Sequence, residues 1–138
     1  MTMETSQGNL ILNVKFMDDD HKAMLDSLNA LVAVSSSGAE AVAINEAFVD
    51  LVNLTCAHFE REEMSMLENG YPEYAQHKSE HSALIEQISA LAQRLNVETN
   101  SVPSDEVVAL LTNWVSQHIQ TADRAYARYL REVGAANR

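Results

Sequence analysis

Apolar side chains recur every three or four residues along most of this chain, which is the spacing of one face of an α-helix. The pattern predicts four amphipathic helices, at about residues 18–34, 39–69, 72–97 and 104–133. Their inward-facing positions are His21, Leu25, Leu28 and Val32, then Phe48, Leu51, Thr55, His58 and Glu62, then His77, His81, Leu84, Ile88 and Leu91, and finally Val107, Leu111, Trp114 and His118. Each of the four faces therefore carries a histidine where a leucine would be expected.

Short breaks separate the predicted helices. Asp18 to Asp20 suit a helix N-terminus, Gly70 suits a C-terminus, and Pro72 suits the first turn of the next helix. Four helices joined by short connections favour an all-α fold, an antiparallel up-down-up-down four-helix bundle. Residues 1–17 show no helical period but contain several large apolar side chains. We therefore expect an N-terminal arm, residues 1–17, that packs along a bundle domain of residues 18–138.

Composition narrows the classes of function. With 138 residues and 46% apolar side chains, the chain is long enough for one domain with a buried core. Its formal net charge of -11 argues against nucleic acid or an anionic membrane as a partner. The single cysteine, Cys56, is expected to be a small core residue. Because it cannot form an internal disulfide, and no signal peptide or run of ~20 apolar residues is seen, we expect a cytoplasmic protein.

The five histidines are the main chemical feature of the sequence. His58 precedes Glu62 by four residues, and His77 precedes His81 by four, so each pair shares one face of its helix. Counted from one end of an antiparallel bundle, at a rise of ~1.5 Å per residue, all five histidines fall near one layer. The sequence therefore predicts a single site to which all four helices contribute.

One spacing does not suit a regular helix. His118 and Asp123 are five residues apart, which is ~140° around an α-helix with 3.6 residues per turn. We expect the helix to widen here into a π-bulge, a feature that often occurs at functional sites.

A metal centre explains this cluster better than a hydrogen-bonded core does. A lone histidine on an apolar face usually finds a hydrogen-bond partner, but five imidazoles and two carboxylates would cost ~1 to 3 kcal/mol for each group left unsatisfied. Metal coordination satisfies them together. The candidate ligands are His21, His58, Glu62, His77, His81, His118 and Asp123. Seven ligands exceed what one ion takes and suit two ions bridged by the carboxylates, although the ligand types alone fit iron, zinc, copper or nickel.

Two other metal motifs are missing from the sequence. It contains neither the Glu-x-x-His pairs of ferritin-like di-iron proteins nor the H-E-x-x-H motif of zinc proteases. Among nearby acidic residues, Glu60 and Glu63 are expected to be solvated.

The ligand pattern and its surroundings resemble the hemerythrin family, specifically the single-domain bacteriohemerythrins. The matching segments are His-Phe-Glu-Arg-Glu-Glu-Met at 58–64, Gly-Tyr-Pro at 70–72 before His77, Trp-Val-Ser-Gln-His-Ile at 114–119, and Val14, Met17, Asp18 and His21. The resemblance covers residues 14–129 and fills every ligand position.

The resemblance implies a non-haem di-iron centre that binds O2 reversibly, for oxygen storage or transport. The analogous ligands of a six-coordinate iron are His77, His81 and His118, and those of a five-coordinate iron are His21 and His58. The analogous bridges are Glu62, Asp123 and an oxo or hydroxo group. O2 would bind at the open position of the five-coordinate iron, in a pocket lined by Trp114, Val115 and Ile119.

The chain departs from the family pattern in three places, and in the first of them the N-terminal arm lacks the tryptophan often seen there. Asp20 stands where glutamine commonly precedes the first histidine, and Val115 stands where leucine is usual. The ligands themselves are all retained, so these departures concern oxygen affinity and autoxidation, since a smaller pocket residue could admit water.

The leading hypothesis is an oxygen-binding protein rather than an enzyme, because no acid, base or nucleophile stands out beyond the ligands. The first alternative is a regulatory module whose oxygen, nitric oxide or redox state is read by an unidentified protein partner. The second is a di-iron enzyme that consumes peroxide or nitric oxide. We expect a monomer or a weak oligomer.

Overall fold

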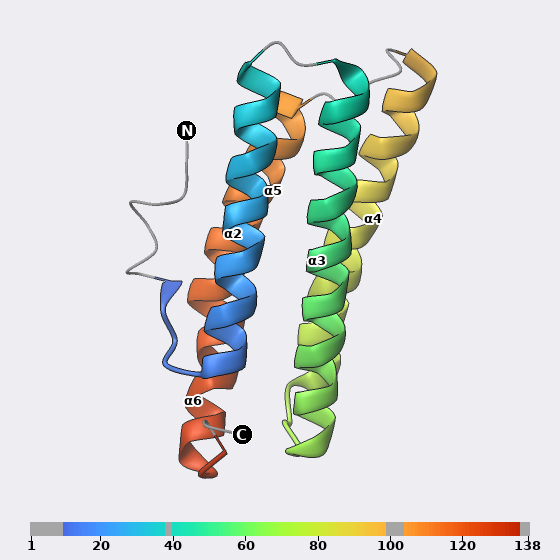
Figure 1. The fold of residues 1–138 in the computed structure, drawn as a ribbon. Coiled ribbons are helices and arrows are strands. Elements are labelled where there is room, and N and C mark those ends of the chain that lie inside the picture. The colour runs from blue at the N-terminus through green and yellow to red at the C-terminus, as the bar shows by residue number, and fades with distance from the viewer. Residues whose placement is uncertain (1–9, 38–39, 99–103, 136–138) are drawn as a thin grey trace.

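The computed structural model describes residues 10–37, 40–98 and 104–135, which form four antiparallel helical segments (Figure 1). The first three are α2 (Lys15–Ser36), α3 (Ala41–Glu68) and α4 (Tyr74–Glu98). The fourth consists of α5 (Ser104–His118), the π-helical turn η2 (Ile119–Asp123) and α6 (Arg124–Glu132). The described residues contain no β-strand. The all-α, up-down-up-down bundle predicted from the sequence is confirmed.

The start of α2 differs from the sequence prediction and explains what Asp18 does. The helix begins at Lys15, ahead of the expected start at Asp18 to Asp20. The Asp18 carboxylate accepts hydrogen bonds from the backbone N–H groups of Leu12, at 2.8 Å, and Asn13, at 3.0 Å. It therefore ties down the segment that precedes the helix instead of capping the first amides of the helix.

Residues 10–14, the described part of the expected arm that precedes α2, lie against the bundle. Leu10, Leu12 and Val14 are buried. The Arg131 guanidinium on α6 donates a 2.7 Å hydrogen bond to the carbonyl of Leu12. Residues 1–9 lie outside the described residues, and the division of the chain into an arm and a bundle domain stays a prediction.

The predicted inward faces agree with the observed core along α3, where all five expected positions are buried. Two positions differ elsewhere. On α2, Leu31 is buried in place of Val32, and on α5, Val115 is buried whereas Trp114 is half-buried. The side chains of Leu91 and Val107 lie outside the described residues. Within the part of the chain that is described, no helix is long and apolar enough to cross a membrane.

The turn between α3 and α4 brings the end of one helix beside the start of the next. Gly70 adopts a φ of 63°, a left-handed conformation that glycine accepts without steric cost. The N–H of Tyr71 then bonds back to the carbonyl of Met66 at 2.9 Å. Figure 1 shows this turn at the same end of the bundle as the start of α2 and as α6.

Candidate metal centre

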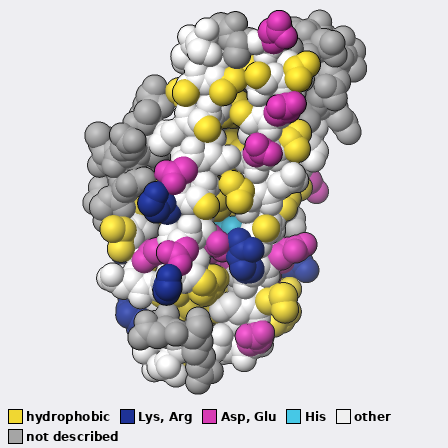
Figure 2. All heavy atoms as spheres, viewed as in Figure 1, with side chains coloured by type: hydrophobic (Ala, Val, Ile, Leu, Met, Phe, Trp, Pro, Cys, Tyr) yellow, Lys and Arg dark blue, Asp and Glu magenta, His cyan; other side chains and the backbone are white. Residues whose placement is uncertain are grey.

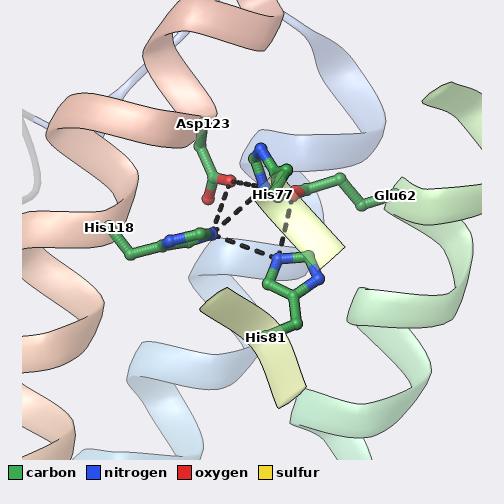
Figure 3. Close-up of side chains that lie close together, drawn as sticks. All are labelled: Glu62, His77, His81, His118 and Asp123. Carbon is green, nitrogen blue, oxygen red and sulfur yellow. Dashed lines mark hydrogen bonds and ion pairs between the residues drawn. The ribbon is translucent and has the colours of Figure 1, made fainter. Parts of the chain in front are cut away.

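All seven predicted ligands converge in the interior of the bundle, near the end that holds the α3–α4 turn. Every one of them is at most 5% exposed. Their ligand atoms form two groups, and the atoms of each group lie within 4.8 Å of one another. The three-histidine group contains Glu62, His77, His81, His118 and Asp123 (Figure 3). The two-histidine group contains His21, His58, Glu62 and Asp123.

Glu62 belongs to both groups because its two carboxylate oxygens face different histidines. Oε2 lies 2.8 Å from Nε2 of His58, in the two-histidine group. Oε1 contacts Nε2 of His77 and lies 3.3 Å from Nε2 of His81, in the three-histidine group. One carboxylate therefore spans the two halves of the site.

Asp123 spans the site in the same way from the opposite side of the bundle. Its Oδ2 lies 3.0 Å from Nε2 of His21. Its Oδ1 lies 2.9 Å from Nε2 of His77 and 3.0 Å from Nε2 of His118. Both carboxylates thus offer one oxygen to each group, as a pair of bridging ligands must.

The π-helical turn η2 makes this arrangement possible. His118 is the last residue of α5, and Asp123 is the last residue of η2. Because the hydrogen bonds of a π-helix run from i to i+5, residues five apart face the same side there. The predicted π-bulge is therefore confirmed, and both side chains point into the bundle (Figure 3).

Unsatisfied polar atoms show that the residues fit metal ions. Several buried polar atoms of the site face one another without forming a well-aligned hydrogen bond: Nε2 of His21, Nε2 of His58, both carboxylate oxygens of Glu62 and Oδ1 of Asp123. In the other group, Nε2 of His118 lies 3.1 Å from Nε2 of His81 and 3.2 Å from that of His77. Ring nitrogens that face one another have too few protons to pair fully. Cations between these atoms would satisfy all of them at once.

The metal-free site is a cluster of strongly coupled charges. Burial lowers the pKa of His58, but the carboxylates of Glu62 and Asp20 outweigh burial and raise this pKa to about 10. Burial likewise lowers the pKa of His77, which Asp123 and Glu62 raise to about 9. Burial and the charge of Asp123 raise the pKa of Glu62, and the neighbouring histidines lower it to about 2. Without metal, His58 and His77 therefore carry a proton that the neighbouring carboxylates stabilise.

The outer nitrogen of His58 has a carboxylate partner. Its Nδ1 lies 2.9 Å from Oδ2 of Asp20, and it must be the donor because an ionised carboxylate only accepts. Arg61 holds Asp20 through two hydrogen bonds, of 2.8 and 2.7 Å. Burial raises the pKa of Asp20, but His58 and Arg61 lower it to about 2. This carboxylate therefore keeps Nε2 of His58 free to face the site.

Two further carboxylates face ligand histidines from neighbouring helices. Nδ1 of His81 donates to Oε2 of Glu63 at 2.8 Å, and Nδ1 of His118 lies 3.4 Å from Oε1 of Glu80. The expectation that Glu63 is solvated was wrong, because its side chain is only 19% exposed and holds His81. Asp20, Glu63 and Glu80 each directly precede or follow a candidate ligand in the sequence, but each contacts a histidine on another helix. Helical spacing within one helix does not predict such contacts between helices.

Aromatic rings cover the three-histidine group. Phe59 stacks on His81 with 3.7 Å between ring centroids and 4° between planes. Trp114 stacks on His118 at 4.2 Å and 18°. Val115 and Ile119, the other expected pocket residues, are buried at 6% and 2% exposure. Sequence reasoning did not single out Phe59, although it directly follows the ligand His58.

The face drawn in Figure 2 carries acidic, basic and apolar side chains around the site, with only a small area of histidine visible. The candidate ligands are thus shielded from solvent, as their low exposure requires.

Comparison with known proteins agrees with the site. The sequence profile of the hemerythrin HHE cation binding domain matches residues 12–130. A bacteriohemerythrin of Stenotrophomonas maltophilia is 32% identical over 127 residues, which cover 92% of this chain and 81% of that protein. A bacteriohemerythrin of Methylococcus capsulatus is 30% identical, with 83% of this chain and 86% of that protein covered.

The fold comparison leads to the same family. A crystal structure of wild-type hemerythrin superposes with a TM-score of 0.77 at 29% identity, covering 85% of this chain and 88% of the other. A second crystal structure, of a leucine-to-phenylalanine mutant, matches with the same values. The profile match over residues 12–130 contains every residue of both candidate ligand groups. The chain therefore belongs to the hemerythrin family.

Proposed function

We propose that this protein binds two iron ions and, through them, binds O2 reversibly, for oxygen storage or transport. The ligands of one iron would be His77, His81 and His118, those of the other would be His21 and His58, and the bridges would be Glu62 and Asp123. The observation that carries this proposal is the division of each carboxylate between the two histidine groups. A single-ion site would not need two carboxylates that each face both ways.

The histidine partners prepare the site for metal. When bound, iron supplies the electrons on which reversible O2 binding depends. The protein supplies orientation, because Asp20 and Glu63 each accept a hydrogen bond from Nδ1 of one histidine and leave its Nε2 directed inward. Family membership also favours a binding protein over an enzyme.

The aromatic cover favours the two-histidine half as the place where O2 binds. Phe59 and Trp114 lie face to face with rings of the three-histidine group. Among the described residues, no ring is stacked in this way on His21 or His58. We propose that Val115 and Ile119 complete an apolar pocket beside this less covered half and limit the access of water to it.

Metal analysis combined with an optical spectrum tests the proposal. We expect two irons per chain, and a spectrum of the reduced protein that changes on exposure to air and returns when O2 is removed. Fewer than two irons, or no oxygen-dependent change, would contradict the proposal. Irreversible consumption of O2 or peroxide over repeated cycles would instead indicate an enzyme. We place this activity in the cytoplasm, in a monomer or weak oligomer.

A further inference from the structure

A hydrogen-bonded pair lies one turn beyond the two carboxylates of the site. Ser65 follows Glu62 by three residues on α3, and Tyr126 follows Asp123 by three residues on α6. Residues three apart on a helix are neighbours on one face, so each member of the pair lies next to its carboxylate. The hydroxyl groups of Ser65 and Tyr126 are 2.5 Å apart, and Tyr126 is fully buried.

Two other tyrosines fix the position of the Tyr126 ring. Tyr71, in the α3–α4 turn, packs against Tyr126 with 4.8 Å between ring centroids and against Tyr129 with 5.1 Å. The Tyr129 hydroxyl in turn donates to the carbonyl of Asn69 at 2.5 Å. The Asn69 side chain donates a 2.8 Å hydrogen bond to the carbonyl of Ser65. Tyr126 therefore connects α6 to the end of α3 through a rigid aromatic cluster.

The two carboxylates lie on different helical segments, so their separation depends on how those segments pack. Glu62 on α3 and Asp123 at the end of η2 are both buried. Bridging requires them to stay at a fixed separation before a metal ion arrives. A hydrogen bond between the next turns of the same two segments holds α3 and α6 together at that point.

We propose that Tyr126 and Ser65 are positioning residues that set the separation of the bridging carboxylates Glu62 and Asp123, and thereby allow two metal ions to bind side by side. This inference rests on the proposed two-metal function. The hydroxyl of Tyr126 then supports the binding of two metal ions as well as packing in the core. Its loss should lower the affinity for the second ion more than the affinity for the first.

Titration with Co(II) tests this role, with visible absorption, metal analysis and the fluorescence of Trp114, the chain's single tryptophan, as readouts. We expect Tyr126→Phe and Ser65→Ala each to weaken the weaker of the two binding steps by about tenfold, the lower range for lost outer-shell partners of a metal site. Because both remove the same hydrogen bond, the double variant should bind no more weakly than Tyr126→Phe alone. Ser65→Thr, which keeps a hydroxyl, should restore both steps.

Tyr129→Phe is the matched control, because it removes a phenol hydroxyl from the same cluster that is bonded to turn carbonyls. It should lower the thermal stability of the metal-free protein and leave both Co(II) steps unchanged. Unaltered Co(II) binding in Tyr126→Phe and Ser65→Ala, or strictly additive losses in the double variant, would overturn the inference. If Tyr126→Phe does not fold, Ser65→Ala alone decides. If the unmodified protein binds fewer than two Co(II) ions, the proposed function itself fails.

Discussion

Nδ1 of His81 donates a hydrogen bond to the carboxylate of Glu63, with 2.8 Å between the two atoms. Glu63 lies on α3 directly after Glu62, so one helix supplies both a candidate bridging carboxylate and the outer partner of a candidate ligand on α4. Asp20 on α2 does the same for His58 on α3. The outer carboxylates therefore connect neighbouring helices around the site, and they fix the ring orientation that a metal ion would meet.

Replacement of Glu63 should weaken metal binding although Glu63 is not itself a ligand. Glu63→Ala removes the acceptor of His81 Nδ1, which frees the ring to rotate and to change tautomer. We expect a loss of about 10- to 100-fold in metal affinity, the usual range for such partners. Competition between the protein and a chelator for Fe(II) measures this loss. Glu60→Ala, at an exposed position on the same helix, is the control and should bind metal as the unmodified protein does. Equal metal affinities in the unmodified protein, Glu63→Ala and Glu60→Ala would show that Glu63 does not support metal binding.

Replacement of Glu62 should have a larger effect, because one side chain faces both histidine groups. Glu62→Ala removes an oxygen from each half of the site, so we expect iron content well below two per chain after anaerobic loading. Elemental analysis against protein concentration provides the measurement. Glu68→Ala, at an exposed position near the end of α3, should keep two irons. Full iron loading of Glu62→Ala would rule out a bridging role.

The bundle could be predicted from the sequence because local rules determine most of it. Phe48, Leu51 and Thr55 recur at helical spacing and are all buried. The five-residue step from His118 to Asp123 was informative for the same reason, since only a wider turn brings both to one face. The convergence of candidate ligands on predicted inward faces could therefore be predicted without knowledge of the tertiary structure.

The outer partners escaped prediction because they depend on contacts between helices. Glu60 and Glu63 look alike in the sequence, but only Glu63 lies at the boundary with α4, where it meets His81. The start of α2 was placed too late for a related reason, since Asp18 binds amides of the preceding segment rather than those of its own helix. Which residue each of these carboxylates contacts is decided by tertiary structure, and helix periodicity does not predict it.

The metal-free protein should be most stable in mildly acidic solution. The pKa values of His58 and His77 are raised to about 10 and about 9, so their stabilising effect is complete below the unfolded pKa of ~6.5 and is lost as pH rises through those values. The pKa of Glu62 is lowered to about 2, so its contribution is complete above the unfolded pKa of ~4.3 and is lost as pH falls from there through the folded pKa of about 2. Together these groups predict a maximum between ~4.3 and ~6.5.

The free energy of unfolding of chelator-treated protein, measured by urea unfolding on both sides of this maximum and up to about pH 9, gives the pH dependence. The metal-loaded protein should behave differently above neutrality, because metal binding displaces protons from the histidines and is favoured as pH rises. The gap in stability between loaded and metal-free protein should therefore widen from mildly acidic to alkaline pH. A metal-free protein whose stability stays level or increases between about pH 7 and pH 9 would contradict the coupled charges inferred for His58 and His77.

The size of residue 115 should control how long the oxygenated protein survives. Val115 is 6% exposed and lies one turn before His118, so in the proposed pocket its side chain limits the access of water. Val115→Leu should extend the half-life of the oxygenated spectrum several-fold, and Val115→Ala should shorten it.

The added methylene also crowds a packed core, at a cost of about 1 to 3 kcal/mol in unfolding free energy. That cost makes stability and half-life change in opposite directions for Val115→Leu, which separates pocket exclusion from general stabilisation. Val108→Leu, at a half-buried position two turns away on the same helix, should leave the half-life unchanged. Equal half-lives for the leucine and alanine variants at position 115 would show that this residue does not control the access of water to the site.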